Sequence, residues 1–344
     1  MCRTGHKTTG SSQSGDAPAR DAPKGRCHRG VGTGPFASSH VVRLESHSAI
    51  CTDTLPAMTD RPYDTVSFLS DLGHGSDAVG VVHALMRDLA PHVRVVDITH
   101  DVTPFDVRAG SLALARAVAY VPRGVVIACV DPGAGTDRRL VAVEVAGGDG
   151  VFLGPDNGLL ATGVALAGGA DRAVVLDRDE HHLASPGATF AARDVLAPVA
   201  AALSLGTSLD DLGTAIDPGS LLPSVVPIPR DEDGVLACEV LWVDRFGNCQ
   251  INVSTDDIDA VFGTGTRRVR VSFGDELRNV EIVGSYGEIG AGALGLVIDA
   301  SGLLSLAIDR ASAAQHLGIG EGESVRLAPS DGAGGVTVPV ALRS

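Results

Sequence analysis

Aromatic side chains are scarce in this 344-residue sequence, which has one Trp, three Tyr and eight Phe, or 3% of the chain. The hydrophobic residues make up 44%, so the core must be built from Val, Leu, Ile and Ala. That content excludes a largely disordered chain, and the length suits one or two globular domains. An aromatic residue in a loop is therefore worth inspecting as a ligand contact.

Positive charge is also in short supply. The chain has 27 Lys and Arg against 42 Asp and Glu, a formal net charge of −15, and both of its lysines, Lys7 and Lys24, precede Met58. A general basic surface for nucleic acid or an anionic membrane is excluded by this balance. We therefore expect neither a nucleic-acid partner nor a membrane partner.

Long apolar runs and paired cysteines are absent as well. No run approaches the roughly 18 residues of a membrane span, and the first residues lack the layout of a secretory signal. The cysteines at positions 2, 27, 51, 129, 238 and 249 show neither a CxxC pair nor the Cys/His spacing of a zinc site. We expect a cytoplasmic location and reduced, mostly structural thiols.

The texture of the sequence changes along the chain. Residues 1–60 are rich in small residues without a sustained period, which indicates a disordered extension, or an untranslated one if Met58 is the true start. Residues 61–225 alternate β-branched runs with Ala- and Leu-rich helical stretches, which predicts an α/β domain with a largely parallel sheet. After a Pro- and Asp-rich linker at 226–234, short strands separated by turns predict a small all-β, barrel-like domain over 235–344.

Candidate site residues are those that directly follow the expected strands, because ligands bind at the carboxyl ends of strands in α/β sheets. Asp71 follows TVSFLS, where its carboxylate suits either the hydroxyls of a ribose or the cap of the helix after Ser76. The next strand ends in DITHDVTPFDV, which is compatible with metal chemistry, an acid/base pair or a turn with several caps. Its candidate residues are Asp97, His100, Asp101, Phe105 and Asp106.

The third strand runs directly into DPGAGTDRR. The turn residues would present Asp131 at the edge of the sheet and return Arg138 toward it, so the carboxylate either orients a water nucleophile or forms a plain loop ion pair. GPDNGLL (154–160) and DRFGNCQIN (244–252) combine Asp or Asn with glycines. Each suits a purine edge, an amino acid or a tight hairpin.

Seven segments in order over residues 65–330 resemble the S-adenosyl-L-methionine hydroxide adenosyltransferase family, which includes fluorinases and chlorinases. They are FLSDLG, VVDITHDVTPFDV, VDPGAGTDRR, GPDNGLL, TFAARDVLAP, DRFGNCQIN and IDASGLLSLAIDRASAAQHLG. The resemblance implies a homotrimer whose active sites lie between the α/β domain of one subunit and the β-barrel domain of its neighbour. It also implies hydrolysis of S-adenosyl-L-methionine (SAM) to adenosine and L-methionine, by attack of water at C5′ and with neither a metal nor another cofactor.

The resemblance assigns a role to each candidate residue. Asp71 would hold the ribose hydroxyls, and Phe105 would pack against the sugar where halogenases have Trp. Asp131 and Arg138 would be two members of an Asp-Arg-His set that positions the water. The substrate contacts implied for the second domain are Asp244 with the methionine ammonium, Phe246, Asn248 and Ser312 with or near adenine, and Ser301.

Two positions depart from the family pattern. Ala191 stands where the family's hydrolases have the His of the set, and Ala300 lacks a hydroxyl expected to help hold methionine. The neighbouring His74, His181 and His182 are candidates to replace the missing imidazole. The alternatives are a SAM- or adenosine-binding protein with lost or slow turnover and, less favoured because an anionic Asp131 would repel halide, a SAM-dependent halogenase.

Overall fold

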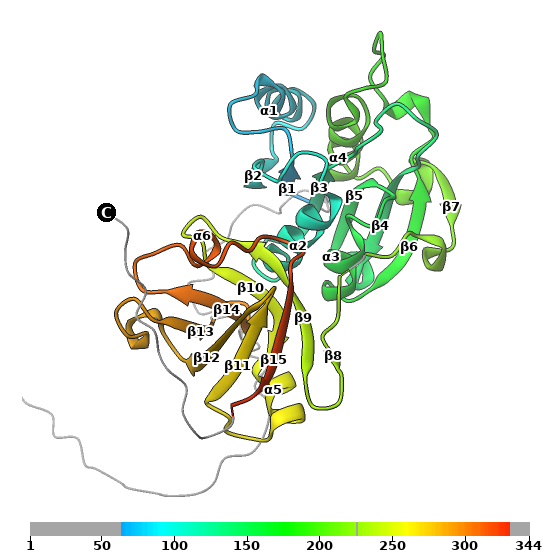
Figure 1. Ribbon diagram of the computed structural model, residues 1–344. Helices are drawn as coiled ribbons and strands as arrows, with labels where there is room; N and C mark the ends of the chain where they lie inside the picture. The colour runs from blue at the N-terminus through cyan, green and yellow to red at the C-terminus, as the bar shows by residue number, and fades with distance from the viewer. Residues whose placement is uncertain (1–62, 225, 331–344) are drawn as a thin grey trace, which may run out of the picture. The chain divides into compact units, whose positions relative to one another are not determined.

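The computed structural model describes residues 63–224 and 226–330. A seven-stranded sheet and an eight-stranded sheet follow one another along this part of the chain (Figure 1). The extension predicted at 1–60 lies outside the described residues.

The first sheet has the strand order β2-β1-β3-β5-β4-β6-β7. Strands β2, β1, β3 and β5 pair in parallel, whereas β4, β6 and β7 pair antiparallel along the other edge. The strands are β1 (Thr65–Ser70), β2 (Arg94–Thr99), β3 (Gly124–Cys129), β4 (Leu140–Val145), β5 (Gly150–Pro155), β6 (Ala170–Val175) and β7 (Thr214–Ile216).

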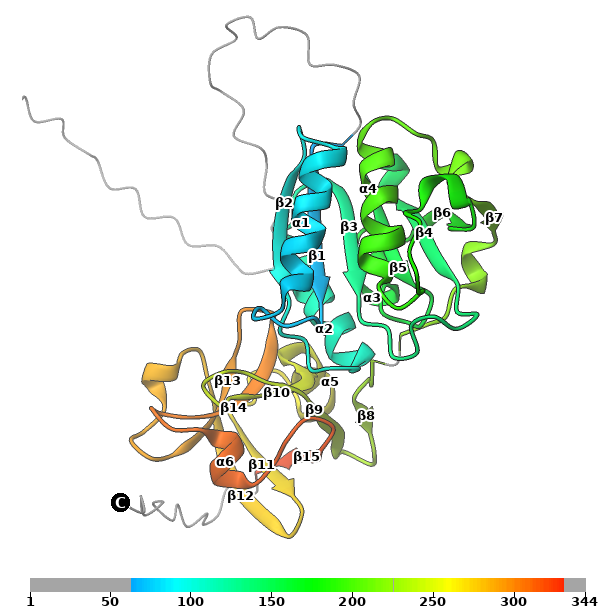
Figure 2. The same cartoon turned by 90° about the horizontal axis from the view of Figure 1, so that it is seen from above.

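Helices cover both faces of this sheet, with α1 and α4 on one face and α2 and α3 on the other (Figure 2). Successive β3 residues face opposite layers: Ile127 packs in the core that contains Met86 of α1, and Ala128 packs in the core that contains Leu114 of α2. The helices are α1 (Asp77–Leu89), α2 (Val107–Ala117), α3 (Ala161–Leu166) and α4 (Ala197–Ser204), with a π-helical turn over Ala192–Leu196.

The second sheet closes on itself. Its order is β10-β14-β13-β12-β11-β15-β9, with β9 paired back to β10 and β8 added beside β9. Its interior is filled by aliphatic side chains such as Ile251, Val271 and Leu306. The elements are β8 (Arg230–Asp231), β9 (Leu236–Val243), β10 (Cys249–Ser254), α5 (Thr255–Phe262), β11 (Arg268–Phe273), β12 (Glu276–Val283), β13 (Leu294–Ile298), β14 (Leu303–Ile308), α6 (Ala313–Leu317) and β15 (Ser324–Pro329).

The predicted fold class is confirmed: an α/β domain with a largely parallel sheet precedes a β-barrel domain. The last strand of the first sheet ends at Ile216 and β8 begins at Arg230; the residue limits given above for the domains and linker stay predictions. The barrel also carries two short helices that the strand-rich pattern did not indicate. In the described ranges the longest helix, α1, has 13 residues, and none is long and apolar enough to cross a bilayer.

Candidate functional site

Two carboxylates that the sequence singled out lie at the ends of neighbouring strands. Strands β1 and β3 pair in parallel with Ser70 opposite Cys129, so Asp71 and Asp131 follow at the same edge of the sheet. Burial raises the pKa of the Cys129 thiol to about 12, and the negative charges of Asp131 and Asp71 add to the rise. The structure therefore brings both carboxylates near one buried thiol, which stays protonated and cannot serve as a nucleophile.

Asp71 does not cap helix α1. That cap is the hydroxyl of Ser76, which accepts a hydrogen bond from the Ala78 N–H at 3.2 Å. The Oδ2 atom of Asp71 instead accepts the backbone N–H of Phe105 at 2.9 Å. Phe105 has a left-handed φ of 69°, and the residue is 72% exposed. The carboxylate thus holds a strained backbone that presents an open aromatic ring beside it.

Asp131 and Arg138 form the ion pair expected from the turn between them. The Asp131 side chain is only 8% exposed, and Arg138 also donates from Nη1 to the carbonyl of Pro132 at 2.9 Å. Both side chains line a cavity of about 460 Å³. A carboxylate fixed in this way on a cavity wall can accept a hydrogen bond from a water and hold its oxygen in one direction.

The same cavity is bordered by Ala191, which stands where the family's hydrolases have His, and by a histidine that can replace the missing imidazole. It is lined by Ala191 and by His182, whose side chain is 17% exposed. Burial lowers the pKa of His182, although Asp179 opposes the change. Its buried Nε2 atom has no hydrogen-bond partner among the described residues. A neutral imidazole, whose unpartnered Nε2 atom is itself buried, therefore lines the cavity of Asp131.

The other two candidate imidazoles are placed differently. The His74 Nε2 atom lies 3.6 Å from the Asp101 carboxylate, and the His74 ring packs against His100 at a centroid distance of 5.4 Å. His181 belongs to a short 3₁₀ turn and is not among the residues that line the cavity. Of the three, His182 is the one that shares a cavity with Asp131.

GPDNGLL serves as scaffold. Asp156 pairs with Arg139 and accepts the Leu222 N–H at 2.8 Å. The Asn157 amide donates to the carbonyl of Val130 at 2.9 Å, directly before Asp131. These partners use the polar atoms of the turn to fix the start of the Asp131 loop, which favours the structural alternative over a ligand contact.

In the barrel domain, Asp244 organises the turn between β9 and β10. Its Oδ1 accepts the N–H groups of Phe246 and Asn248, both at 2.8 Å, and its Oδ2 accepts the side-chain amide of Asn248 at 2.7 Å. The φ of Gly247 is +83°, and a Cβ there would lie 2.0 Å from Ser312 Oγ, so only glycine fits. The turn therefore packs directly against the start of α6, which Ser312 caps by accepting the Gln315 N–H at 3.1 Å.

Two cavities meet around this turn. One cavity, of about 580 Å³, is lined by Asp244, Phe246, Asn248 and Ser312. Phe246 is 77% exposed. Ser301 lines the second, of about 170 Å³, together with Ala300 and Asp299. Asp244, Asn248 and Tyr286 line both. The structure thus gathers all five barrel-domain candidates around two adjoining cavities.

The sequence reasoning missed two aromatic residues of these walls. Tyr286 borders both cavities, and Trp242 borders the smaller one. Their scarcity was the available signal, since the chain has one Trp and three Tyr. Neither lies in a segment that carries the family resemblance, so only the composition pointed to them.

Comparison with known proteins accounts for both halves of the chain. Residues 66–213 match the SAM hydroxide adenosyltransferase N-terminal domain, and residues 238–326 match the C-terminal domain of the same family. A protein of Salinispora tropica named (R)-S-adenosyl-L-methionine hydrolase is 40% identical over 266 residues, which cover 77% of this chain and 98% of that protein. A protein of Actinoplanes sp. named fluorinase is 28% identical, with 76% and 96% covered.

A solved structure agrees with these matches. The uncharacterized conserved protein from Thermotoga maritima superposes with a TM-score of 0.70 at 32% identity, covering 76% of this chain and 99% of the other. The two family domains, in the order and at the positions of the α/β sheet and the barrel, establish that this chain belongs to the SAM hydroxide adenosyltransferase family.

Proposed function

We propose that this protein hydrolyses SAM to adenosine and L-methionine, with a water attacking C5′ of the adenosyl group. The observation that carries the proposal is Asp131, paired with Arg138 on the wall of a cavity at the carboxyl end of the parallel strands. Three relatives named (R)-S-adenosyl-L-methionine hydrolase support the reaction, and at 38–40% identity these three are more similar to this chain than the fluorinase at 28%.

Displacement of methionine from SAM by water does not require a strong general base. As the water oxygen bonds to C5′, the C5′–S bond breaks and its electron pair leaves on sulfur, which turns a sulfonium into the neutral thioether of methionine. A leaving group this good makes placement and partial desolvation of the water the main requirements. Asp131, held by Arg138, orients the water, and neither a metal nor another cofactor is assigned a step.

We assign the last proton transfer to His182. The attacking water becomes positively charged as the C–O bond forms, and the neutral imidazole that lines the same cavity can accept its proton. His182 thereby takes the place of the imidazole that Ala191 lacks. A binding protein without turnover is the alternative that Ala191 favours, and it predicts that labelled SAM stays intact in the complex.

His182→Ala is expected to lower kcat roughly tenfold with little change in KM, because it removes a proton acceptor and no substrate contact. Burial lowers the pKa of His182 below 6.5. The neutral, accepting form therefore predominates at pH 7, and kcat of the native protein should fall as the pH drops through that lowered pKa. A pH profile of kcat for both proteins checks this, and the acidic limb should disappear in the variant.

The double variant His182→Ala/Ala191→His is the matched control, because it returns an imidazole to the cavity at the position where the family's hydrolases have one. It should regain most of the lost rate. An unchanged acidic limb in His182→Ala, or no recovery in the double variant, would show that His182 has only a packing role.

Substrate binding is divided between the two domains in this proposal. Asp71 and Phe105 hold the ribose, Asp244 binds the methionine ammonium, Phe246, Asn248 and Ser312 surround adenine, and Ser301 borders the methionine end. We further propose a homotrimer in which a neighbouring subunit's barrel domain completes each site, in the cytoplasm and without a nucleic-acid or membrane partner. The cavity beside Asp131 in the α/β domain and the cavity beside Asp244 in the barrel domain support this division; Asp71 and Phe105 are not among the residues that line the first.

Incubating the purified protein with SAM tests the reaction. Equal amounts of adenosine and L-methionine should appear by chromatography, and added chloride should give no 5′-chloro product. A chloride-dependent halogenated nucleoside would favour the halogenase alternative, and the absence of any adenosine would remove the proposal.

A further inference from the structure

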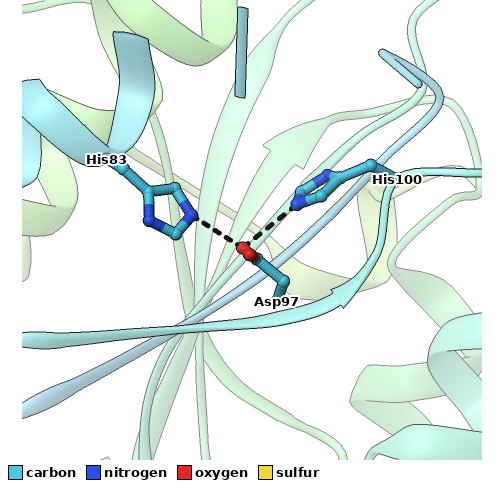
Figure 3. Close-up of side chains that lie close together, drawn as sticks. All are labelled: His83, Asp97 and His100. Carbon is cyan, nitrogen blue, oxygen red and sulfur yellow. Dashed lines mark hydrogen bonds and ion pairs between the residues drawn. The ribbon is translucent and has the colours of Figure 1, made fainter. Parts of the chain in front are cut away.

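A second cluster of polar side chains lies at the outer edge of the α/β sheet. His83 projects from α1, Asp97 lies on the edge strand β2, and His100 directly follows that strand (Figure 3). The Oδ1 atom of Asp97 is 2.8 Å from His83 Nε2 and 3.0 Å from His100 Nε2. One ligand atom from each residue falls within 4.8 Å of the others.

The orientation of His100 separates a metal site from a hydrogen-bonded triad. His100 is fully buried, and its Nε2 atom contacts Asp97 at 3.0 Å as an ion pair without the direction of a hydrogen bond. In a hydrogen-bonded triad the ring N–H would aim at the carboxylate oxygen. In a metal site each lone pair aims instead at a point between the ligands, which fits the direction of the His100 nitrogen. The His83 Nε2 atom is hydrogen-bonded to Asp97 Oδ1 at 2.8 Å and would exchange that bond for the ion.

The hydrogen bond between Ser70 and His100 favours the tautomer of His100 that can bind a metal ion. Its Nδ1 atom lies 2.8 Å from the hydroxyl of Ser70. With Nδ1–H donating to that oxygen, the lone pair is on Nε2, and the ring is held as metal-binding imidazoles are held by their outer partners. The Phe68 ring packs edge-on against His100 with centroids 4.6 Å apart, which fixes the plane of the imidazole.

We propose that His83, Asp97 and His100 bind one divalent transition-metal ion of the Zn²⁺ class. Two imidazoles and a carboxylate are nitrogen and oxygen donors that suit zinc rather than Mg²⁺ or Ca²⁺. Tetrahedral bonds of about 2.0–2.1 Å separate ligand atoms by roughly 3.3 Å. The two contacts of Asp97 Oδ1, at 2.8 and 3.0 Å, need only small outward shifts to reach that spacing, and the two histidine nitrogens lie within 4.8 Å of each other. His83 and Asp97 have side chains that are 36% exposed, which leaves an entry path and room for a water as fourth ligand.

The ion would brace the loop that carries Asp71. The carbonyl of His100 accepts the N–H of Gly73 at 2.8 Å, so fixing His100 also fixes the loop after β1. It would tie α1 to β2 through His83 as well. This role is structural and independent of the hydrolysis proposed above, and the ion takes no part in the reaction.

Metal binding to the full chain tests the proposal directly. After removal of metals with a chelator, dialysis against ZnCl₂ and elemental analysis should show one more Zn²⁺ per chain in the native protein than in His83→Ala. Cobalt(II) should give visible d–d absorption bands in the native protein that His83→Ala loses. Apparent affinity should drop at least tenfold in that variant.

His74→Ala is the matched control, because His74 packs beside His100 but lies outside the cluster. It should keep the stoichiometry and the cobalt bands. His83→Gln, which retains a polar side chain at this half-exposed helix position, guards against misfolding and should behave like His83→Ala. Equal zinc content and equal cobalt spectra in the native protein and both His83 variants would overturn the proposal, whatever the enzymatic activity.

Discussion

Asp131→Ala is expected to lower kcat for SAM hydrolysis by about 10²- to 10³-fold, with a smaller effect on KM. The carboxylate is nearly buried, paired with Arg138 and placed on the cavity wall, so its removal frees the water from the one orientation that attacks C5′. Losses of this size are typical when a group that positions or deprotonates a nucleophile is removed. Steady-state kinetics with purified SAM measure the effect.

Two further variants separate orientation from general loss of charge. Asp131→Asn keeps an oxygen that can accept a hydrogen bond from water and should retain more activity than Asp131→Ala. Asp137→Ala removes an exposed carboxylate from the same loop and should leave kcat within about twofold of the native value, as surface substitutions usually do. If Asp131→Ala were as active as Asp137→Ala, the catalytic role of Asp131 would be refuted.

Two inactive variants should restore activity to one another when they share a trimer. Asp131→Ala damages the α/β half of the site, and Asp244→Asn damages the barrel half. In a cyclic trimer whose sites combine halves from neighbouring subunits, every mixed trimer contains one site with both halves intact. Co-expression with two tags and tandem purification should therefore give about one third of the native rate.

A mixture of two variants in the same domain is the control for this experiment. Asp131→Ala co-expressed with Arg138→Ala places both defects in the α/β half, so no mixed trimer has an intact site and no recovery is expected. Native mass spectrometry should show three 35.1-kDa chains in each complex. Recovery absent from the first mixture, or a complex that is not trimeric, would contradict a site shared between subunits.

The sequence indicated the candidate residues Asp71 and Asp131 because the local signals around them agree. β-branched runs predicted β1 and β3, and the rule for strand ends selected Asp71 and Asp131 as candidates. The ion pair of Asp131 with Arg138 followed from a short turn rich in Gly and Pro. Such arrangements depend on residues close in sequence, which is where pattern reasoning is strongest.

Contacts that join distant or irregular segments could not be obtained in this way. His182 reaches the Asp131 cavity through residues 177–191, a stretch with little regular structure, so its position depends on loop packing. The meeting of His83 with Asp97 depends on the rotation of α1 about its axis, which the hydrophobic period fixes only coarsely. Ser254 and Asp257 form a capping box for α5. Their spacing is a sequence signal for a helix start, but it lies between segments that predict strands, so the helix was not predicted.

The fate of the water oxygen tests the central claim most directly. Hydrolysis of SAM in H₂¹⁸O, with mass analysis of both products, reports which atom the water attacks. Attack at C5′ predicts one ¹⁸O atom in the 5′-hydroxyl of adenosine and none in L-methionine, at equal yields of the two products. Adenosine without the label, or label recovered in an amino-acid product, would contradict water attack at C5′.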